Sequence, residues 1–176
     1  TAIVAGLAFG LDVKSITQNL QENFKLPPGR GSILQGINDV TILDSSYNAS
    51  SASVLSFLEL LGKLSIPTHR QAMFVMGDMK ELGSYSQYEH GLVAKAIPEF
   101  VDHLVLVGTL TKDLVLPIVS KHQRKFKTLV YFSTNREAGE YLKTHLPQKI
   151  IILFKGSQLL EEAIKFILKD PDDKKY

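Results

Sequence analysis

Three polar segments of this sequence contain the residue types that bind anions and nucleotides. They read Asp44-Ser45-Ser46-Tyr47-Asn48-Ala49-Ser50, Gly77-Asp78-Met79-Lys80-Glu81-Leu82-Gly83 and Lys155-Gly156-Ser157. Aspartate, serine, asparagine and glycine also cap helices and build turns in any α/β protein, so one segment alone is weak evidence. Two of the three segments, however, contain a lysine, which is unfavourable at a helix N-terminus unless an anion is bound there. Together the segments predict a crevice for an anionic ligand.

Several common catalytic motifs are missing from the sequence. It has no GxxxxGK[ST] phosphate loop, no GxGxxG and no GxSxG, and the pair Gly29 and Gly31 lies in a linker. The five histidines never show HxxxH or HExxH spacing, so the sequence predicts no metal site. His90 is interpreted as a helix-surface or core-edge residue rather than a catalyst. The polar segments therefore amount to half of a site, and no catalytic residue is assigned.

The polar segments each follow an apolar run that is typical of a strand. Strands are expected at 32–35, 40–43, 72–76, 103–107, 128–132 and 150–154, with the first two paired across a turn. Helices are expected around 54–64, 84–98, 114–119, 134–145 and 159–168, with capping-box patterns at 84–87 and 134–137. Continuous apolar strands that alternate with helices indicate a mostly parallel sheet covered on both faces. The predicted fold is an open, doubly wound, Rossmann-like α/β sheet, whose ligands bind beyond the carboxyl ends of the strands.

Size and composition fit an ordinary globular domain. The 176 residues are 44% apolar and 22% charged, and the net charge of +2 is too small to argue for nucleic-acid or membrane binding. The absence of cysteine excludes disulfides and thiolate sites and fits a reducing compartment. Residues 1–24 predict two short helices, the second capped by Asp12, and 26–31 predict a linker. Because the sequence opens on Thr1 inside an apolar helical pattern, we expect a piece of a longer protein.

Four motifs of the sequence resemble the C-terminal domain of the Mur ligases, ATP-dependent amide-forming enzymes of peptidoglycan precursor synthesis. They are PPGRGS at 27–32, DSSYNASSAS at 44–53, MGDMKELG at 76–83 with His90 seven residues on, and FKGSQ at 154–158. They occur in the family's order across essentially the whole chain, and GDMKELG with SYNA resembles the branch that adds D-alanyl-D-alanine. The sequence departs from the family's usual Asp-Asp-Ser-Tyr-Asn-Ala-Asn-Pro in two places. Ser45 replaces the second aspartate and brings no charge, and Ser50-Ser51 replaces Asn-Pro.

The resemblance implies that this chain is the last part of a larger enzyme. Residues 1–26 would be the terminal helices of the central ATP-binding domain plus a linker, 27–170 the C-terminal domain, and 171–176 a frayed tail. The full enzyme would use ATP to phosphorylate the carboxylate of UDP-N-acetylmuramoyl-tripeptide (UDP-MurNAc-tripeptide). The amine of D-alanyl-D-alanine (D-Ala-D-Ala) would then attack the acyl phosphate. ATP and Mg²⁺ would be bound mainly by the central domain, so the isolated chain is expected to be inactive. A cytoplasmic monomer with its own central domain as partner is expected.

The resemblance also implies roles for individual residues. ATP would be bound by Arg30 at the hinge, whose forked guanidinium suits phosphate or ribose oxygens. It would also be bound by four residues after the second strand, namely Asp44, Ser45, Tyr47 and Asn48. The carboxylate of the incoming dipeptide needs a cation and backbone N–H donors. These would come from Lys80, Lys155, Gly156 and Ser157.

Two other interpretations stay open at this level. One is another ligase of the same superfamily, such as a folylpolyglutamate synthase or a different Mur ligase, which would share the fold and differ in the acceptor. The other is a non-catalytic Rossmann-like module that binds a partner or regulates, which is consistent with Ser45 and the missing phosphate loop. Acceptor assays on the full protein would distinguish the first alternative from a ligase for D-alanyl-D-alanine. A phosphate loop encoded upstream of Thr1 would exclude the second alternative.

Overall fold

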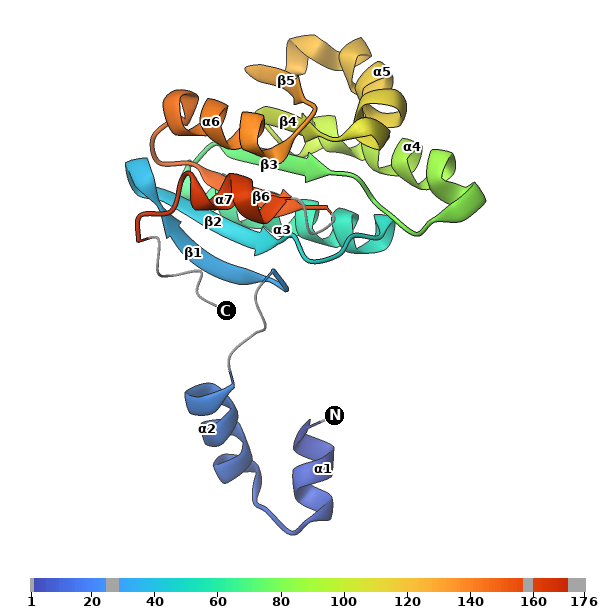
Figure 1. Ribbon diagram of the computed structural model, residues 1–176. Coiled ribbons are helices and arrows are strands. Elements are labelled where there is room, and N and C mark those ends of the chain that lie inside the picture. Colours follow the sequence, from blue (N-terminus) through green and yellow to red (C-terminus); the bar gives the residue numbers. More distant parts are fainter. Residues whose placement is uncertain (1, 25–28, 157–159, 171–176) are drawn as a thin grey trace.

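The computed structural model describes residues 2–24, 29–156 and 160–170, and its centre is one six-stranded sheet (Figure 1). The strand order is β1-β2-β6-β3-β4-β5. The strands are β1 (Ser32–Gly36), β2 (Val40–Ser45), β3 (Ala72–Gly77), β4 (His103–Val107), β5 (Thr128–Phe132) and β6 (Ile151–Lys155). β1 runs antiparallel to β2, and the other neighbouring pairs are parallel. The predicted open, mostly parallel sheet is confirmed, and so is the pairing of its first two strands.

Helices cover both faces of this sheet. On one face lie α3 (Ser51–Thr68), α4 (Ser86–Ala96) and α5 (Leu116–Val119), and on the other lie α6 (Asn135–His145) and α7 (Glu161–Lys165). Central strands bury alternate residues in the two cores: in β3, Phe74 faces α3 and Val75 faces α7. Because every residue of β3 is buried, the strand reads in the sequence as a continuous apolar run.

Local sequence signals set some helix ends and fail at others. The predicted capping box of α6 is present between Thr134 and Glu137. The one predicted at 84–87 is wrong, because Gly83–Tyr85 forms a 3₁₀ turn and α4 begins at Ser86 without a side-chain cap. The predicted helix at 114–119 is split into a π-helical segment, η4 (Thr111–Val115), and the single turn of α5. The described part of the last helix, α7, is shorter than predicted.

The first two helices lie apart from the sheet in Figure 1. They are α1 (Ala2–Ala8) and α2 (Val13–Asn23), and Asp12 caps α2 as predicted by accepting from the backbone N–H of Ser15. They pack against each other through Gly6 and Ile16. No residue of α1 is buried, so most of the apolar surface of this helical pair faces outward.

The carboxyl ends of the parallel strands meet at one edge of the sheet. Ser45 of β2 pairs with Lys155 of β6, and Lys155 pairs with Met76 of β3. Just beyond, the backbones of Gly77 and Gly156 approach so closely that a Cβ on Gly156 would lie 2.6 Å from the Cα of Gly77. Glycine at position 156 is therefore required for the two strand ends to approach, whereas a Cβ on Gly77 would press only on the Leu160 side chain, at 3.2 Å. The three polar segments all leave the sheet at this edge.

Candidate functional site

Lys155 is the buried cation of the carboxyl edge. Only 3% of it is exposed, and its ammonium donates to the hydroxyl of Ser45 and to the backbone carbonyl of Asn48, each at 3.1 Å. The ring of Phe57, on α3, lies 4.9 Å from the ammonium nitrogen. Both hydrogen-bond acceptors are neutral oxygens. They use two of the three N–H groups of the ammonium, which leaves the third for a ligand.

The electrostatic surroundings of Lys155 favour an anion. Burial lowers the pKa of the Lys155 ammonium from its ordinary 10.5 to about 8, because the charged form loses hydration. Asn48 lies two residues before Ser50, whose side chain caps α3 by accepting from the backbone N–H of Ser53. The N-terminus of this 18-residue helix carries a partial positive charge. A bound phosphate or carboxylate would stabilise both charges.

A second cation reaches this region from the segment before β1. The guanidinium of Arg30 lies over the ring of Tyr47, 4.1 Å from its centroid. Two backbone hydrogen bonds attach this segment to the end of β2: Tyr47 N–H donates to the Gly29 carbonyl at 3.0 Å, and Gly31 N–H donates to the Asp44 carbonyl at 2.8 Å. Arg30 is thus held beside Tyr47 although the two are 17 positions apart in the sequence.

These residues line one small cavity. Its volume is about 300 Å³, and its lining comprises Gly29, Arg30, Ser45, Tyr47, Asn48, Ala49, Ser50, Ser53, Phe57 and Lys155. This is the low end of the size range of ligand pockets. It is enough for part of a nucleotide, with cations, hydroxyls and an aromatic ring as the available groups. We call it the Lys155 cleft.

The structure brings together four of the five residues predicted to bind ATP. Arg30, Ser45, Tyr47 and Asn48 all line the Lys155 cleft. The side chain of Asp44 does not, because successive residues of β2 point to opposite faces of the sheet. Its carboxylate is buried and accepts from the backbone and hydroxyl of Ser46.

The residues predicted to bind the dipeptide are divided. Lys155 lies in the cleft with the predicted ATP residues, and Gly156 contacts Gly77 at the closing strands. Lys80 is exposed on the segment after β3 and does not line the cleft. Ser157 lies outside the described residues.

Two further residues, which the sequence assigned no role in the site, are Phe57 in the cleft wall and His90 behind the segment that follows β3. Phe57 was expected only as part of an apolar helix face, yet its ring forms one wall of the cleft beside Lys155. His90 is fully buried, and its ring accepts from the backbone N–H of Met79. The position of His90 seven residues after the MGDMKELG motif was the available signal, since it places the histidine in the first turns of α4, directly after that segment.

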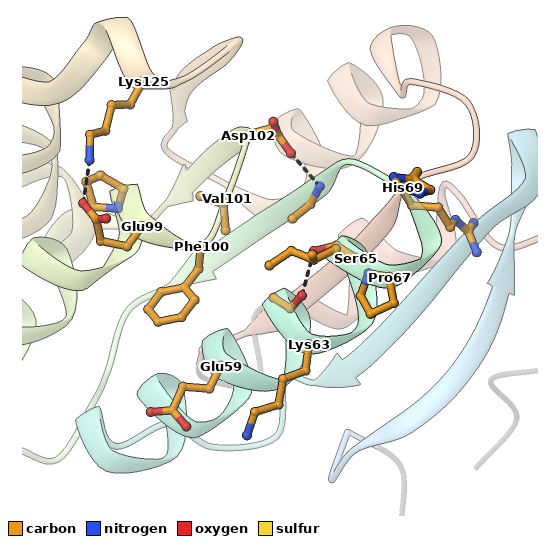
Figure 2. Close-up of a pocket in the computed structure, with 15 residues that line it drawn as sticks. Glu59, Lys63, Ser65, Pro67, His69, Glu99, Phe100, Val101, Asp102 and Lys125 are labelled. Atoms are coloured by element: carbon orange, nitrogen blue, oxygen red, sulfur yellow. Dashed lines mark hydrogen bonds and ion pairs between the residues drawn. The ribbon is translucent and has the colours of Figure 1, made fainter.

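A larger cavity, of about 820 Å³, lies at the opposite edge of the sheet (Figure 2). It is lined by the C-terminal half of α3 and the turn after it, the start of β3, residues 98–102 before β4, and Lys125. Figure 2 shows two of its charged groups bonded locally: Glu99 pairs with Lys125, and Asp102 accepts from the backbone N–H of Ala72. Ligands of open α/β sheets bind at the carboxyl ends of strands, so size alone does not make this cavity the site.

Within residues 2–24, 29–156 and 160–170, no helix is long and apolar enough to cross a membrane. In the same ranges, no group of three histidine, aspartate or glutamate side chains lies close enough together to hold a metal ion.

Residues 29–158 match the family described as Mur ligase, glutamate ligase domain. The chain is 26% identical over 173 residues to the UDP-N-acetylmuramoyl-tripeptide--D-alanyl-D-alanine ligase of Bacillus subtilis, covering 97% of this chain and 37% of that protein. It is 35% identical over 157 residues to the ligase of the same name from Synechocystis, covering 89% of this chain and 33% of that protein. The chain thus spans about a third of the length of these relatives.

Solved structures resemble the chain in the same way. A crystal structure of MurF from Acinetobacter baumannii superimposes with a TM-score of 0.72 and 29% identity, covering 89% of this chain and 33% of that one. MurF ligase from Thermotoga maritima, solved in complex with ADP, gives a TM-score of 0.68 over 98% of this chain and 37% of that one. At 21% identity the second likeness shows the fold alone.

Proposed function

The chain belongs to the Mur ligase family, and we propose that it is the C-terminal domain of the ligase that joins D-Ala-D-Ala to UDP-MurNAc-tripeptide at the expense of ATP. The observation that carries the proposal is the Lys155 cleft, which places Arg30, Tyr47 and Lys155 at the ligand-binding edge of the sheet. The two relatives named above, both ligases for this dipeptide, support the acceptor.

On the nucleotide side, the proposal assigns ATP to the Lys155 cleft. Arg30 offers forked donors to phosphate or ribose oxygens, and its contact with Tyr47 keeps the guanidinium in place. Lys155 and the N-terminus of α3 offer positive charge to a second anionic group. The contacts of Lys155 with Ser45 and Asn48 favour this side over the dipeptide side expected from the sequence. The nucleotide role of Asp44 stays a prediction, since its side chain lies outside the cleft.

On the acceptor side, the proposal assigns the carboxylate of D-Ala-D-Ala to Lys80. This lysine is exposed at the same edge, two positions after the buried Asp78. In the reaction, the tripeptide carboxylate displaces ADP at the γ-phosphorus of ATP and becomes an acyl phosphate. The amine of the dipeptide then forms the amide and releases phosphate. The chain's own residues bind and orient ATP and the dipeptide, and no step is assigned to a metal held by this chain.

We also propose that α1 and α2 belong to the preceding central domain. Their outward apolar surface supports this, because Phe9 is 87% exposed and Leu7 and Val4 are also exposed. Such surface normally packs against a partner. The cytoplasmic location and the monomeric state stay predictions.

The full-length protein tests the proposed function directly. It should release phosphate from ATP only when UDP-MurNAc-tripeptide and D-Ala-D-Ala are both present, with one ligated product per phosphate released. The 176-residue chain alone should show no such turnover, because the groups that position and neutralise the phosphates lie elsewhere. Turnover by the isolated chain, or none by the full-length protein with all three substrates, would overturn the proposal.

A further inference from the structure

The segment that carries Lys80 is held at two neighbouring points. Asp78 accepts from the backbone N–H of Thr111 at 2.9 Å, and Gly108 makes room for it, since a Cβ there would lie 2.6 Å from the carboxylate. The side chain of Met79 is 1% exposed and packs in the core beneath α4. Lys80 directly follows these two anchored residues, so their backbone sets where its side chain begins.

His90 supplies the bond that holds the backbone of Met79. The backbone N–H of Met79 donates to Nε2 of His90 at 3.2 Å, and Nδ1 of His90 lies 2.8 Å from the carbonyl of Ser86 and 3.3 Å from its hydroxyl. A carbonyl only accepts, so Nδ1 carries the proton, and an N–H only donates, so Nε2 carries the lone pair. The ring is therefore a neutral imidazole that links α4 to the start of the Lys80 segment.

We propose that His90 is a positioning residue for the acceptor site, which it serves by fixing Met79 and thereby the place of Lys80. The inference rests on the proposed function, because it needs Lys80 to meet the carboxylate of D-Ala-D-Ala. The hydrogen bond between His90 and Ser86 lies within α4, and the helix does not need it to form. The bond to Met79 joins residues 11 positions apart and satisfies an N–H that would otherwise be buried without a partner. A small displacement of a binding group is enough to weaken recognition strongly.

Two substitutions separate the two bonds of the ring. In His90→Gln, the side-chain oxygen can reach the position of Nε2 and accept from Met79, while the contact with Ser86 is lost. In His90→Asn, the shorter amide can donate to Ser86, as Nδ1 does, but does not reach Met79. His103→Asn is the matched control. That histidine is also buried, at the start of β4, with hydrogen bonds to Gln71 and Thr128 at the opposite edge.

The full-length enzyme is assayed with each variant for kcat and for the KM values of D-Ala-D-Ala and ATP. His90→Asn should raise the KM for D-Ala-D-Ala about tenfold and leave the KM for ATP within about twofold. His90→Gln and His103→Asn should lower thermal stability but keep the KM for the dipeptide within about threefold. A merely structural role predicts that all three variants act alike, and that result overturns the inference. If His90→Asn does not fold, a raised dipeptide KM in His90→Gln overturns it as well.

A second readout does not depend on ligation. In the ¹⁵N-labelled chain, the Met79 amide should exchange with solvent faster in His90→Asn than in wild type and remain protected in His90→Gln. Equal protection of the Met79 amide in both variants would contradict the hydrogen bond between Met79 and His90. Lys80→Ala tests the proposed function itself: if it leaves the KM for D-Ala-D-Ala unchanged while the Met79 amide behaves as expected, the acceptor assignment fails and the bond stands.

Discussion

Lys155 and Ser45 lie directly opposite each other on β6 and β2, and the ammonium nitrogen of Lys155 is 3.1 Å from the hydroxyl oxygen of Ser45. Both residues are almost completely buried. The sequence has a serine where the family usually has an aspartate, so this lysine meets a neutral hydroxyl in the place of a carboxylate. Because no carboxylate of residue 45 pairs with Lys155, an anionic ligand can take that place at the carboxyl edge of the sheet.

The lowered pKa of Lys155 predicts a specific pH dependence of stability. Between pH 8 and 10.5 the folded chain has lost the Lys155 proton and the unfolded chain still binds it. The free energy of unfolding must therefore gain a contribution that rises with pH over this window and is absent below it. Urea titrations of wild type and Lys155→Met from pH 7 to 10.5 measure the difference. If the free energy of unfolding depends on pH in the same way in both proteins, the pKa of Lys155 is not lowered.

Lys155→Ala tests which substrate this lysine serves. Loss of one charge-assisted hydrogen bond should raise the KM for ATP of the full-length enzyme on the order of tenfold to a hundredfold. The KM for D-Ala-D-Ala should change less. The reverse pattern, a change confined to the dipeptide, would restore the assignment expected from the sequence and move the nucleotide away from the Lys155 cleft.

Arg70 is expected to matter for stability and not for ligand binding. Its guanidinium donates to four oxygens at the amino edge of the sheet, those of Asp39, Thr41, Lys149 and Ile150. Arg70→Met leaves these acceptors with fewer partners and should lower the free energy of unfolding by about 2–4 kcal/mol.

Arg136→Met is the control for Arg70. It removes the same charge from an ion pair with Glu140 in which the arginine side chain is 70% exposed, and should change stability by less than about 1 kcal/mol. Both values come from urea unfolding at one pH. Equal effects of the two substitutions would show that the contacts of Arg70 add nothing beyond its charge.

The exposed apolar face formed by α1 and the adjacent Phe9 gives a prediction about the domain boundary. Phe9→Ser should leave the stability of the 176-residue chain nearly unchanged, because 87% of Phe9 is already exposed. In the full-length protein, where we propose that this face is covered, the same substitution should lower the melting temperature by several degrees. Thermal unfolding of the two proteins, each with and without the substitution, measures this. A large loss in the isolated chain would place the partner of Phe9 within this chain.

The sequence predicts the central strands β3, β4 and β6 well because each is a nearly continuous apolar run with polar residues at its ends. The start of α4 was misplaced for a physical reason. Ser84 and Gln87 have the spacing of a capping box, but Gly83, at φ +51°, leads into a 3₁₀ turn that replaces it. Spacing along the chain does not reveal which backbone conformation a glycine adopts.

The site was predicted in its parts but not in its grouping. The polar segments share one edge of the sheet because each follows a strand, and the carboxyl ends of parallel strands lie at the same edge. That Lys155 belongs with Ser45 depends on the register between strands 110 residues apart, which no local pattern encodes. The role of His90 was missed for a similar reason, because its partner is a backbone N–H and not a side chain.

Acceptor selectivity of the full-length protein tests the central claim most directly. With ATP and UDP-MurNAc-tripeptide fixed, kcat/KM is measured for D-Ala-D-Ala and for single amino acids such as D-glutamate and L-lysine, with product masses as the readout. We predict that D-Ala-D-Ala is preferred by about a hundredfold or more, since a site built for its groups leaves polar atoms unpaired with the others. Preference for a single amino acid, or ligation that does not consume ATP, would contradict the account.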